Sequence, residues 1–425
     1  MADALGDRSH APPPPDRRVD VVVFVGTFPK YSETFILAEL LALERMGARL
    51  HVIAFGRITE AVVQEDVARL QAPVAYLPDP ASSTGSSAAR AAHIRLLRTH
   101  GLGYLAALRR LSGSPGYSRK RLAEAATLAD RLIDLGTPPV YVHFGGKTAT
   151  VTRFATEMAG SSYALSAHAV DVWTTPRDEL RAAVHAAEAV HTCSDEARQY
   201  VETLADSRTP VRLLHHGVHI PPAPRRIADD APVTVLSVGR LTAKKGHATL
   251  LEAAALLAAR GIDFTLRLAG EGPDWSALQR QVHHLDLADR VVFLGPLVAD
   301  ELETEFNRAA VFALACRVTA DGDRDGLANA FQEAMARGIP VVGTTLPGIV
   351  ELVGPDGLLV AQDDAAGLAA ALERLIVDPG LRGELGARAR GRVQARFDRS
   401  ALMPAVHESL VQAGIIRRGS ARLGE

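Results

Sequence analysis

The stretch VTVLSVGRLTAKKG, from Val233 to Gly246, decides the fold of this chain. Its apolar residues predict a strand, and the cations Arg240 and Lys245 follow where that strand ends. A helix is expected from about Gly246 to Arg260, because apolar residues recur there at helical spacing. A strand, a charged loop and a helix in this order predict one repeat of an α/β fold.

The same order of elements continues beyond this stretch. The helix expected at 328–338 has a well-marked end, since Gly338 stands at its end and Pro340 follows. Further strands are expected at 263–272, 290–297, 310–316, 339–345 and 357–362, and further helices at 273–285, 363–378 and 400–413.

The first half of the chain has the same alternation of strands and helices, formed by a different sequence. VDVVVFVG (Val19–Gly26) is a continuous β-branched run, typical of a strand buried on both faces. A helix follows, with Ser32 as a candidate N-cap and Gly47 as its stop. Further strands are expected at 49–56, 140–146 and 211–218, and another helix is expected at 59–70. Segment 161–173 is expected to begin as a strand and continue as a loop. Segment 189–204 is expected to begin as a strand and continue as a helix.

This alternation predicts two tandem Rossmann-like, doubly wound α/β domains, with a central cleft at the carboxyl ends of their strands. HIPPAPRRIADDAP, with four prolines and no apolar period, marks the linker. We therefore expect a disordered tail at 1–18, a first domain at 19–218, a linker at 219–232, a second domain at 233–398, a final helix at 399–414 and a tail at 415–425.

The composition is that of an ordinary soluble protein. The chain has 425 residues, of which 47% are hydrophobic and 23% charged, and a formal net charge of −2. A dedicated nucleic-acid binder would be more basic, so no nucleic-acid partner is expected. Cys193 and Cys316 have no metal-type spacing and cannot make a disulfide framework, which favours a cytoplasmic location. Neither a signal peptide nor a membrane-spanning run is expected.

Charged residues gather in the loops after the strands, where doubly wound sheets bind ligands. Arg240 and Lys245 suit a pyrophosphate, although they can also be read as plain surface charge. The loop LAGEGP contains Gly270 and Glu271 and is either a nucleotide loop or a tight turn. It lacks the G-x-G-x-x-G fingerprint, which disfavours a nicotinamide enzyme.

Two carboxylates lie eight residues apart in DRDGLANAFQEAMARG (323–338). Asp325 is expected in the loop before a helix, pointing into the cleft, whereas Glu333 lies two turns further on. The unpaired backbone N–H groups at the start of this helix would form an anion site. These groups belong to Leu327, Ala328 and Asn329.

The same region contains DGDRD (Asp321–Asp325), which resembles an acidic site for Mg²⁺ holding a diphosphate. The alternative is an exposed acidic loop. Arg240 and Lys245 could already neutralise the phosphates, so no metal site is expected.

His168 and Asp171 follow a strand of the first domain in AHAVDVW. A histidine at a strand end that faces a cleft can hydrogen-bond a hydroxyl group or a phosphate oxygen. The alternative is a loop histidine without a functional role.

A basic stretch lies between Ala81 and Ala123, without any Asp or Glu. Leucines and a tyrosine stand between its cations, so it could lie on an anionic membrane or hold an anionic acceptor. A solvated helical face is the alternative. The cations are Arg90, Arg95, Arg98, Arg109, Arg110, Arg119, Lys120 and Arg121.

In this order the motifs resemble those of the family 4 glycosyltransferases, which are retaining enzymes with the GT-B fold. The resemblance covers Val19 to Ala413. An SETFI opening (32–36) is similar to that of members that build exopolysaccharides and glycosylated natural products. The other matching segments are SAHAVDVW, CSDEARQYV, HHGV, GRLTAKKGHATLLEA, LAGEGP, VVFLGPL and LANAFQEAMARGIPVVGT.

The resemblance implies roles for the residues of the second domain. Arg240 and Lys245 would bind the donor diphosphate and stabilise the departing nucleotide. Glu333 would hold the ribose hydroxyls, and Asp325 would hold hydroxyls of the donor sugar. The remaining nucleotide contacts would come from Gly270, Glu271, Leu327, Ala328 and Asn329.

For the first domain the resemblance implies that His168 contacts the donor sugar near its reacting carbon. Gly26 would lie near the phosphates, and Glu33 and Asp171 would lie on the acceptor side. The final helix would cross back to this domain.

Two positions depart from the family pattern. Asp325 stands where the family usually has Glu, so the hydroxyl pattern of the donor sugar is open. Pro347-Gly348 replaces a Gly-Gly pair, which puts one backbone contact to phosphate in question.

We therefore expect a metal-independent, retaining hexosyltransferase that needs no cofactor beyond its nucleotide-sugar donor, UDP-linked in preference to GDP-linked. The acceptor would be a hydroxyl of a glycan, a lipid-linked molecule or a natural product. A GT-B-type sugar-nucleotide epimerase and a non-catalytic nucleotide-sugar-binding protein are the alternatives. The basic stretch, from Arg90 to Arg121, leaves a peripheral contact with the inner face of the membrane open.

Overall fold

The structure is a computed structural model and describes residues 19–30, 33–57, 65–223 and 232–417. The chain forms two compact units, and the second consists of residues 194–196 and 215–402. The rest of the chain belongs to the first unit. Several sequence predictions lie outside the described residues: the tail at 1–18, the N-cap at Ser32, residues 224–231 of the linker and residues 418–425 of the final tail.

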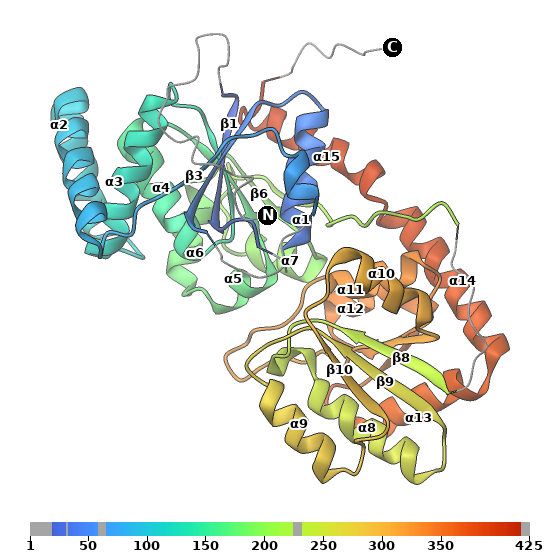
Figure 1. Ribbon diagram of the computed structural model, residues 1–425. Coiled ribbons are helices and arrows are strands. Elements are labelled where there is room, and N and C mark those ends of the chain that lie inside the picture. Colours follow the sequence, from blue (N-terminus) through green and yellow to red (C-terminus); the bar gives the residue numbers. More distant parts are fainter. Residues whose placement is uncertain (1–18, 31–32, 58–64, 224–231, 418–425) are drawn as a thin grey trace. The chain divides into compact units, whose positions relative to one another are not determined.

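A seven-stranded parallel sheet forms the centre of the first unit, with the order β3-β2-β1-β4-β5-β6-β7 (Figure 1). Residues Val21–Val25 are fully buried, as the β-branched run predicted. The strands are β1 (Val21–Thr27), β2 (Leu50–Gly56), β3 (Val74–Tyr76), β4 (Val140–His143), β5 (Tyr163–Ala167), β6 (Ala189–Thr192) and β7 (Val211–Leu213).

Helices cover this sheet in successive layers (Figure 1). α4 packs on β1, β4 and β5, α3 packs on α4, and α2 packs on α3. The helices are α1 (Thr34–Arg45), α2 (Ser83–Ser112), α3 (Arg119–Asp134), α4 (Lys147–Ala159), α5 (Ala169–Thr174), α6 (Arg177–His185) and α7 (Asp195–Glu202), with a 3₁₀ turn η1 (Glu65–Arg69).

The second unit has a six-stranded parallel sheet with the order β10-β9-β8-β11-β12-β13. Both sheets place their first strand centrally and cross over to either side, so the predicted doubly wound α/β fold is confirmed. The strands are β8 (Val233–Val238), β9 (Phe264–Ala269), β10 (Val291–Gly295), β11 (Val311–Ala313), β12 (Val341–Thr344) and β13 (Leu358–Val360).

The helices of this sheet alternate with its strands. They are α8 (His247–Ala259), α9 (Trp275–His284), α10 (Ala299–Arg308), α11 (Asn329–Ala336), α12 (Pro347–Val353), α13 (Ala365–Val377) and α14 (Pro379–Arg396), with the 3₁₀ turns η2 (Ala243–Lys245) and η3 (Gly354–Asp356). In the part of the chain that is described, no helix combines the length and the apolar character needed to cross a bilayer.

The last helix, α15 (Arg399–Gln412), ends in the first unit. There the Oγ atom of Ser409 lies 2.8 Å from Nε2 of His191 on β6. Ile415 and Ile416 fall in the segment expected to be a tail, yet both are buried. Their N–H groups donate to the carbonyl of Leu410, so ordered structure continues past the expected boundary.

Two local predictions need correction. The segment after β5 was expected to be a loop, but it forms α5 from Ala169, because Asp171 supplies a hydrogen-bond acceptor at the start of that helix. Of the helix expected at 59–70, the described part contains only the 3₁₀ turn η1.

Candidate active site

The loop after β8 carries the predicted diphosphate cations in the second unit. Arg240 is exposed, and Lys245 ends the 3₁₀ turn η2 directly before α8. Gly246 has a φ of +67°, and a Cβ atom at this position would lie 1.7 Å from the carbonyl oxygen of Ala315. Only glycine allows this close approach, which brings the cationic loop against the chain after β11.

The loop after β9 is joined to the loop after β8 by backbone contacts. The N–H of Leu241 donates to the carbonyl of Glu271 at 2.8 Å. Gly270 has a φ of +134°, and a Cβ atom there would lie 2.1 Å from the carbonyl oxygen of Gly239. The predicted residues Gly270 and Glu271 therefore border the cationic loop, as the sheet order requires.

Lys245 forms an ion pair with Asp325, whose Oδ2 atom lies 2.9 Å from Nζ. Both side chains are largely buried, with exposed fractions of 15% and 13%. Burial is the largest single effect and acts to lower the pKa of Lys245, but Asp325, Cys316 and Asp323 together outweigh it and raise the pKa. Burial acts to raise the pKa of Asp325, but Lys245 and Lys244 outweigh it and lower the pKa. Both residues are therefore charged at neutral pH.

Cys316 contacts this pair and Lys244 lies beside it, and the sequence analysis assigned neither residue a role. The thiol of Cys316 donates to Oδ2 of Asp325 at 3.2 Å. Lys244 forms a parallel ion pair with Asp323 at 3.0 Å. The double lysine before Gly246 was the available signal for this second pair, whereas nothing in the sequence pointed to the thiol.

α11 begins beside this ion pair. Its N-cap residue, Ala328, supplies no side-chain acceptor, and its first turn contains no acidic residue. No side chain caps the first N–H groups of the helix, so its positive dipole end is open, whereas an anion site at 327–329 stays a prediction. Gly348 packs against the backbone of Gly326 in the loop before α11, since a Cβ atom at position 348 would lie 2.1 Å from the carbonyl oxygen of Gly326.

Glu333 lies further along α11 and is partly buried. Burial raises the pKa of its carboxyl. Arg337 and Arg399 oppose this rise, and Glu303 adds to it. A carboxyl in this state can accept hydrogen bonds from neutral hydroxyl groups.

In the first unit, His168 ends the extended chain after β5 and is buried. Its ring is nearly parallel to that of His143 from β4, with centroids 5.4 Å apart and planes within 5°. Nε2 of His168 lies 3.2 Å from Nδ1 of His143. One of these nitrogens donates and the other accepts, so the pair cannot carry a proton on all of its ring nitrogens.

Asp171 connects the ends of two strands. Its carboxylate accepts the backbone N–H of His168 at 3.0 Å and the backbone N–H of Gly145, which follows β4. Burial raises the pKa of this carboxyl to about 7, although the backbone hydrogen bonds oppose that rise. These bonds give Asp171 a role in positioning His168, whereas a contact with the acceptor stays a prediction.

Gly26 and Glu33 lie near the end of β1. Open space surrounds Gly26, where an added Cβ atom would meet no atom within 4 Å. Glu33 directly precedes α1 and forms an ion pair with Lys30. Both residues of this pair line a small hollow with Thr27 and Phe28.

The predicted residues thus fall into two sets. Those at the ends of β8 and β9 and at the start of α11 lie together in the second unit. Those at the ends of β1 and β5 lie in the first unit.

Two doubly wound α/β domains in tandem place the chain in the GT-B class of folds. Sucrose-phosphate synthase from Thermosynechococcus elongatus has this fold at a TM-score of 0.70 and 20% identity, over 92% of this chain and 98% of that one. HepE of Anabaena in complex with UDP-glucose is similar at a TM-score of 0.69 and 18% identity, over 92% of this chain and 99% of that one.

Sequence relatives narrow this class to one family. Residues 232–378 match the family model "Glycosyl transferases group 1". The putative colanic acid biosynthesis glycosyltransferase WcaL of Escherichia coli is 30% identical over 368 residues, which are 81% of this chain and 88% of that protein. The chain therefore belongs to the group 1 glycosyltransferases.

Other relatives match over shorter stretches. WcaL of Salmonella typhimurium is 36% identical over 47% of this chain, and the chain spans 49% of that protein. A GDP-mannose-dependent phosphatidylinositol monomannoside mannosyltransferase of Mycolicibacterium smegmatis is 37% identical over 35% of this chain and 40% of its own length.

Proposed function

We propose that this protein transfers a hexose from a nucleoside diphosphate sugar, UDP-linked in preference to GDP-linked, to a hydroxyl of a glycan, lipid-linked or natural-product acceptor. The observation that carries the proposal is the Lys245–Asp325 ion pair beside the uncapped start of α11. A buried lysine that stays charged, together with unpaired N–H groups, suits the two phosphates of such a donor.

The cations supply the main catalytic effect in this proposal. When the sugar leaves, negative charge grows on the diphosphate, and Arg240, Lys245 and the α11 dipole stabilise it. These groups are already in place before the reaction, so little reorganisation is needed at the transition state.

Asp325 would select the donor sugar. Both described contacts to its carboxylate end on Oδ2, from Lys245 and from Cys316. Oδ1 can then accept a hydrogen bond from a sugar hydroxyl. Glu333 would accept from the ribose, and Gly270 and Glu271 would border the nucleoside.

The first unit would supply the acceptor side and the group nearest the reacting carbon. His168 is fixed by the contact of its ring with His143 and by the bond from its N–H to Asp171, so its ring has a defined orientation. We propose that this ring contacts the donor sugar, with Gly26 near the phosphates and Glu33 on the acceptor side. Retention of configuration would follow if the acceptor attacks from the face that the nucleotide leaves.

A metal ion has no assigned task in this mechanism. Asp323 and Asp325 of the DGDRD loop already pair with Lys244 and Lys245. Their negative charge is thus balanced within the protein, which supports a metal-independent reaction.

Donors and acceptors can be screened by nucleotide release. The purified protein is incubated with UDP-sugars or GDP-mannose, with and without an acceptor pool, in Mg²⁺ or EDTA, and products are identified by mass and anomeric NMR signals. We expect acceptor-dependent UDP release that EDTA leaves unchanged, with retained configuration. An isomerised nucleotide sugar without acceptor would indicate an epimerase, and binding without release from any donor would indicate a non-catalytic protein. GDP release alone, or strict dependence on Mg²⁺, would contradict the corresponding part of the proposal.

A further inference from the structure

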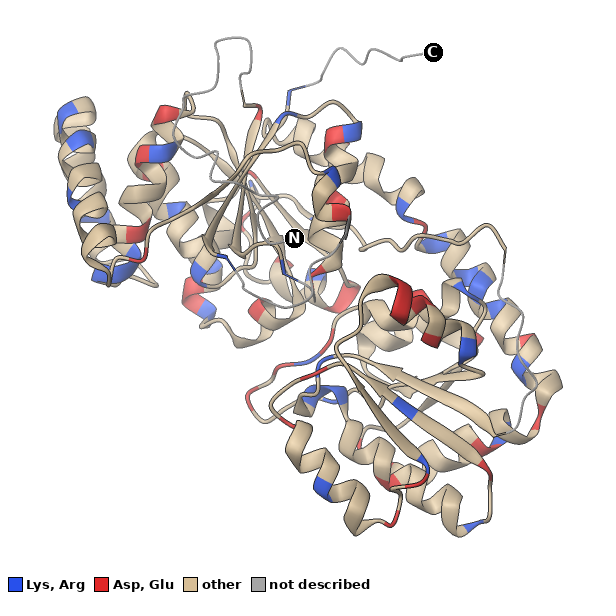
Figure 2. Ribbon diagram, in the orientation of Figure 1, with Lys and Arg blue, Asp and Glu red and all other residues tan. Residues whose placement is uncertain are grey.

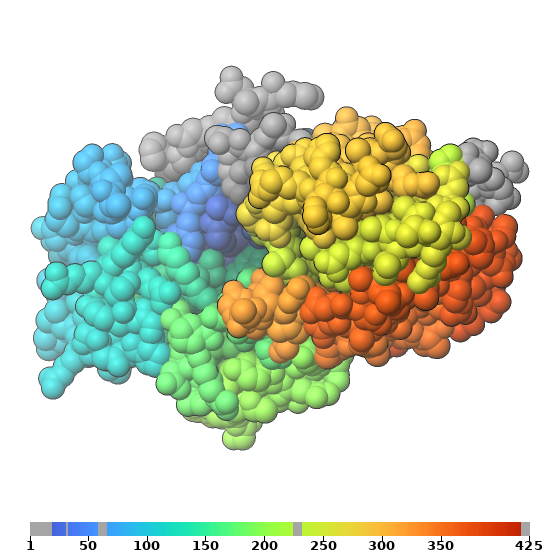
Figure 3. Space-filling view, turned by 90° about the horizontal axis from the view of Figure 1, so that it is seen from below, coloured from blue at the N-terminus to red at the C-terminus, as the bar shows by residue number. Residues whose placement is uncertain are grey.

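α2 is the outermost helix of the first unit and packs against α3 and α4 (Figures 1 and 3). It carries basic residues and no Asp or Glu (Figure 2). Gly101 interrupts it with φ 52° and ψ −125°, so the helix consists of two segments, 83–100 and 102–112. This helix has no role in the proposed glycosyl transfer.

The inward face of α2 is well defined by burial. Gly85, Ala89, Ala92 and Leu96 are buried in the first segment, and Tyr104, Ala107 and Leu111 are buried in the second. Their spacing of three and four residues is that of one helical stripe. The opposite face must therefore point away from the unit.

Large apolar side chains stand on that opposite face. At about 100° per residue, Ile94 and Leu102 lie opposite the buried stripes of their segments, whereas Leu97 and Leu105 lie toward the sides of the outward face. The exposed fractions are 53% for Ile94, 44% for Leu97, 83% for Leu102 and 48% for Leu105. Four neighbouring apolar side chains in water indicate a surface that another phase or molecule covers.

Four of the eight cations of the basic stretch form ion pairs, and one of these joins Lys120 to Asp79 at 3.5 Å. Arg95 pairs with Asp130 and Asp134, Arg110 pairs with Glu157, and Arg121 pairs with Glu179. These ion pairs fasten α2 and α3 to each other and to the unit. The stretch therefore does not form one continuous basic surface, although its sequence suggested one.

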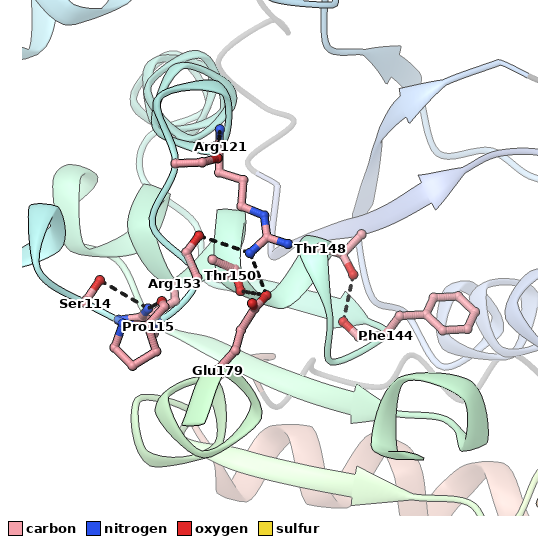
Figure 4. A network of polar contacts seen from close by, with 10 residues as sticks. Ser114, Pro115, Arg121, Phe144, Thr148, Thr150, Arg153 and Glu179 are labelled. Atoms are coloured by element: carbon pink, nitrogen blue, oxygen red, sulfur yellow. Dashed lines mark hydrogen bonds and ion pairs between the residues drawn. The ribbon is translucent and has the colours of Figure 1, made fainter. Parts of the chain in front are cut away.

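The connection between α2 and α3 is held especially firmly (Figure 4). Arg153 donates to the carbonyl of Pro115 at 2.7 Å, and Arg121 donates to Oε1 of Glu179 at 2.7 Å. Thr150 donates to the same Glu179 oxygen at 2.7 Å. These contacts join the connection between α2 and α3 to α4 and α6.

Of the other four cations, Arg119 lies on α3, whereas Arg90, Arg98 and Arg109 lie on α2, are exposed and share its outward face with the apolar residues. No ion pair with a described residue neutralises these three cations. Cations beside protruding leucines match a surface that is anionic outside and apolar beneath. A second copy fits less well, because two such faces meeting about a twofold axis would bring like charges together.

We propose that the outward face of α2 docks on an anionic phospholipid membrane. Leu102, between two glycines at the break in the helix, and its apolar neighbours enter the interface. The three arginines contact lipid phosphates. The protein binds the membrane as a peripheral protein through this face, independently of donor and acceptor.

Vesicle flotation of the full-length protein tests this inference. Vesicles of phosphatidylcholine alone are compared with vesicles that also contain phosphatidylglycerol, at low and high salt and without any donor. We expect binding to the anionic vesicles that salt weakens. Leu102→Asp should lower the partition coefficient at least about tenfold. Arg98→Glu should lower it at least about fivefold, on anionic vesicles only.

Matched control variants place the same changes on the second unit. Val377 is an apolar residue with an exposed fraction of 60%, and Arg280 is an exposed cation on α9. Val377→Asp and Arg280→Glu should float like the wild type, and unchanged melting temperatures would show that all variants fold. Absence of flotation, or equal losses in the α2 and control variants, would overturn the inference. It would also be overturned if light scattering without lipid showed a dimer that Leu102→Asp dissociates.

Discussion

Asp325 holds Lys245 through Oδ2 of its carboxylate, and the thiol of Cys316 donates to the same oxygen. Sequence reasoning found Asp325 and Lys245, because each stands in a loop directly after a strand or before a helix. It did not find that they touch. The contact depends on Gly246, whose missing Cβ lets two loops from distant parts of the sequence pack together.

We predict that Asp325→Asn leaves Lys245 buried without its ion-pair partner, and that it lowers the free energy of unfolding by about 3 kcal/mol. The diphosphate of UDP would replace the lost negative charge. UDP should therefore raise the melting temperature of the variant more than that of the wild type, as measured by differential scanning fluorimetry. Asp323→Asn is the matched control, since it breaks the neighbouring pair with Lys244. Equal UDP shifts in wild type and Asp325→Asn would contradict a diphosphate at Lys245.

His247 gives a pH-dependent prediction. It is buried, no hydrogen bond from the described residues reaches either ring nitrogen, and burial, aided by Lys245, lowers its pKa to about 3. Its folded pKa lies below the unfolded value, so its contribution is present above pH 6.5 and is lost as the pH falls toward 3.

The wild type should therefore lose about 1 kcal/mol more than His247→Leu for each pH unit below 6.5, as measured by urea unfolding. Parallel pH profiles for the two proteins would show that the histidine does not stay neutral in the folded state.

At the scale of elements, strands and the helices that end in glycine were predictable from the sequence. Burial on both faces gives a strand such as β1 its unbroken apolar run, and Gly338 marks the end of α11. α5 was missed because it is short and depends on Asp171. α10, α12 and α14 were not assigned; α12 is only seven residues long, and α14 contains few apolar residues.

The start of α11 supports a prediction about this element. Asn329→Asp changes one amide into a carboxylate of the same shape at the first helical position. The helix dipole should stabilise the added charge by about 0.5 kcal/mol, whereas a bound diphosphate should be repelled. We expect an unchanged or higher melting temperature and a Kd for UDP that rises about tenfold in calorimetry.

Asn307→Asp makes the same chemical change near the end of α10 and should leave the affinity for UDP unchanged. If Asn329→Asp bound UDP as tightly as the wild type, the start of α11 would not be the phosphate site.

At the scale of the whole molecule, two doubly wound sheets and the order of the motifs were sufficient to predict the fold, which the structure confirms. Family membership rests on the relatives, of which WcaL of Escherichia coli matches along most of its length. The outward face of α2 could not be read from the sequence, because ion pairs with distant acids decide which cations stay exposed.

The central claim is that Lys245 binds the diphosphate of a nucleoside diphosphate sugar and stabilises its negative charge when the sugar leaves. The most direct test compares the wild type with Lys245→Ala in nucleotide release from the best donor and acceptor pair, with folding checked by thermal melting. Loss of one preorganised charge at the leaving group should slow release at least about 100-fold. A folded Lys245→Ala protein that releases nucleotide at nearly the wild-type rate would contradict the account.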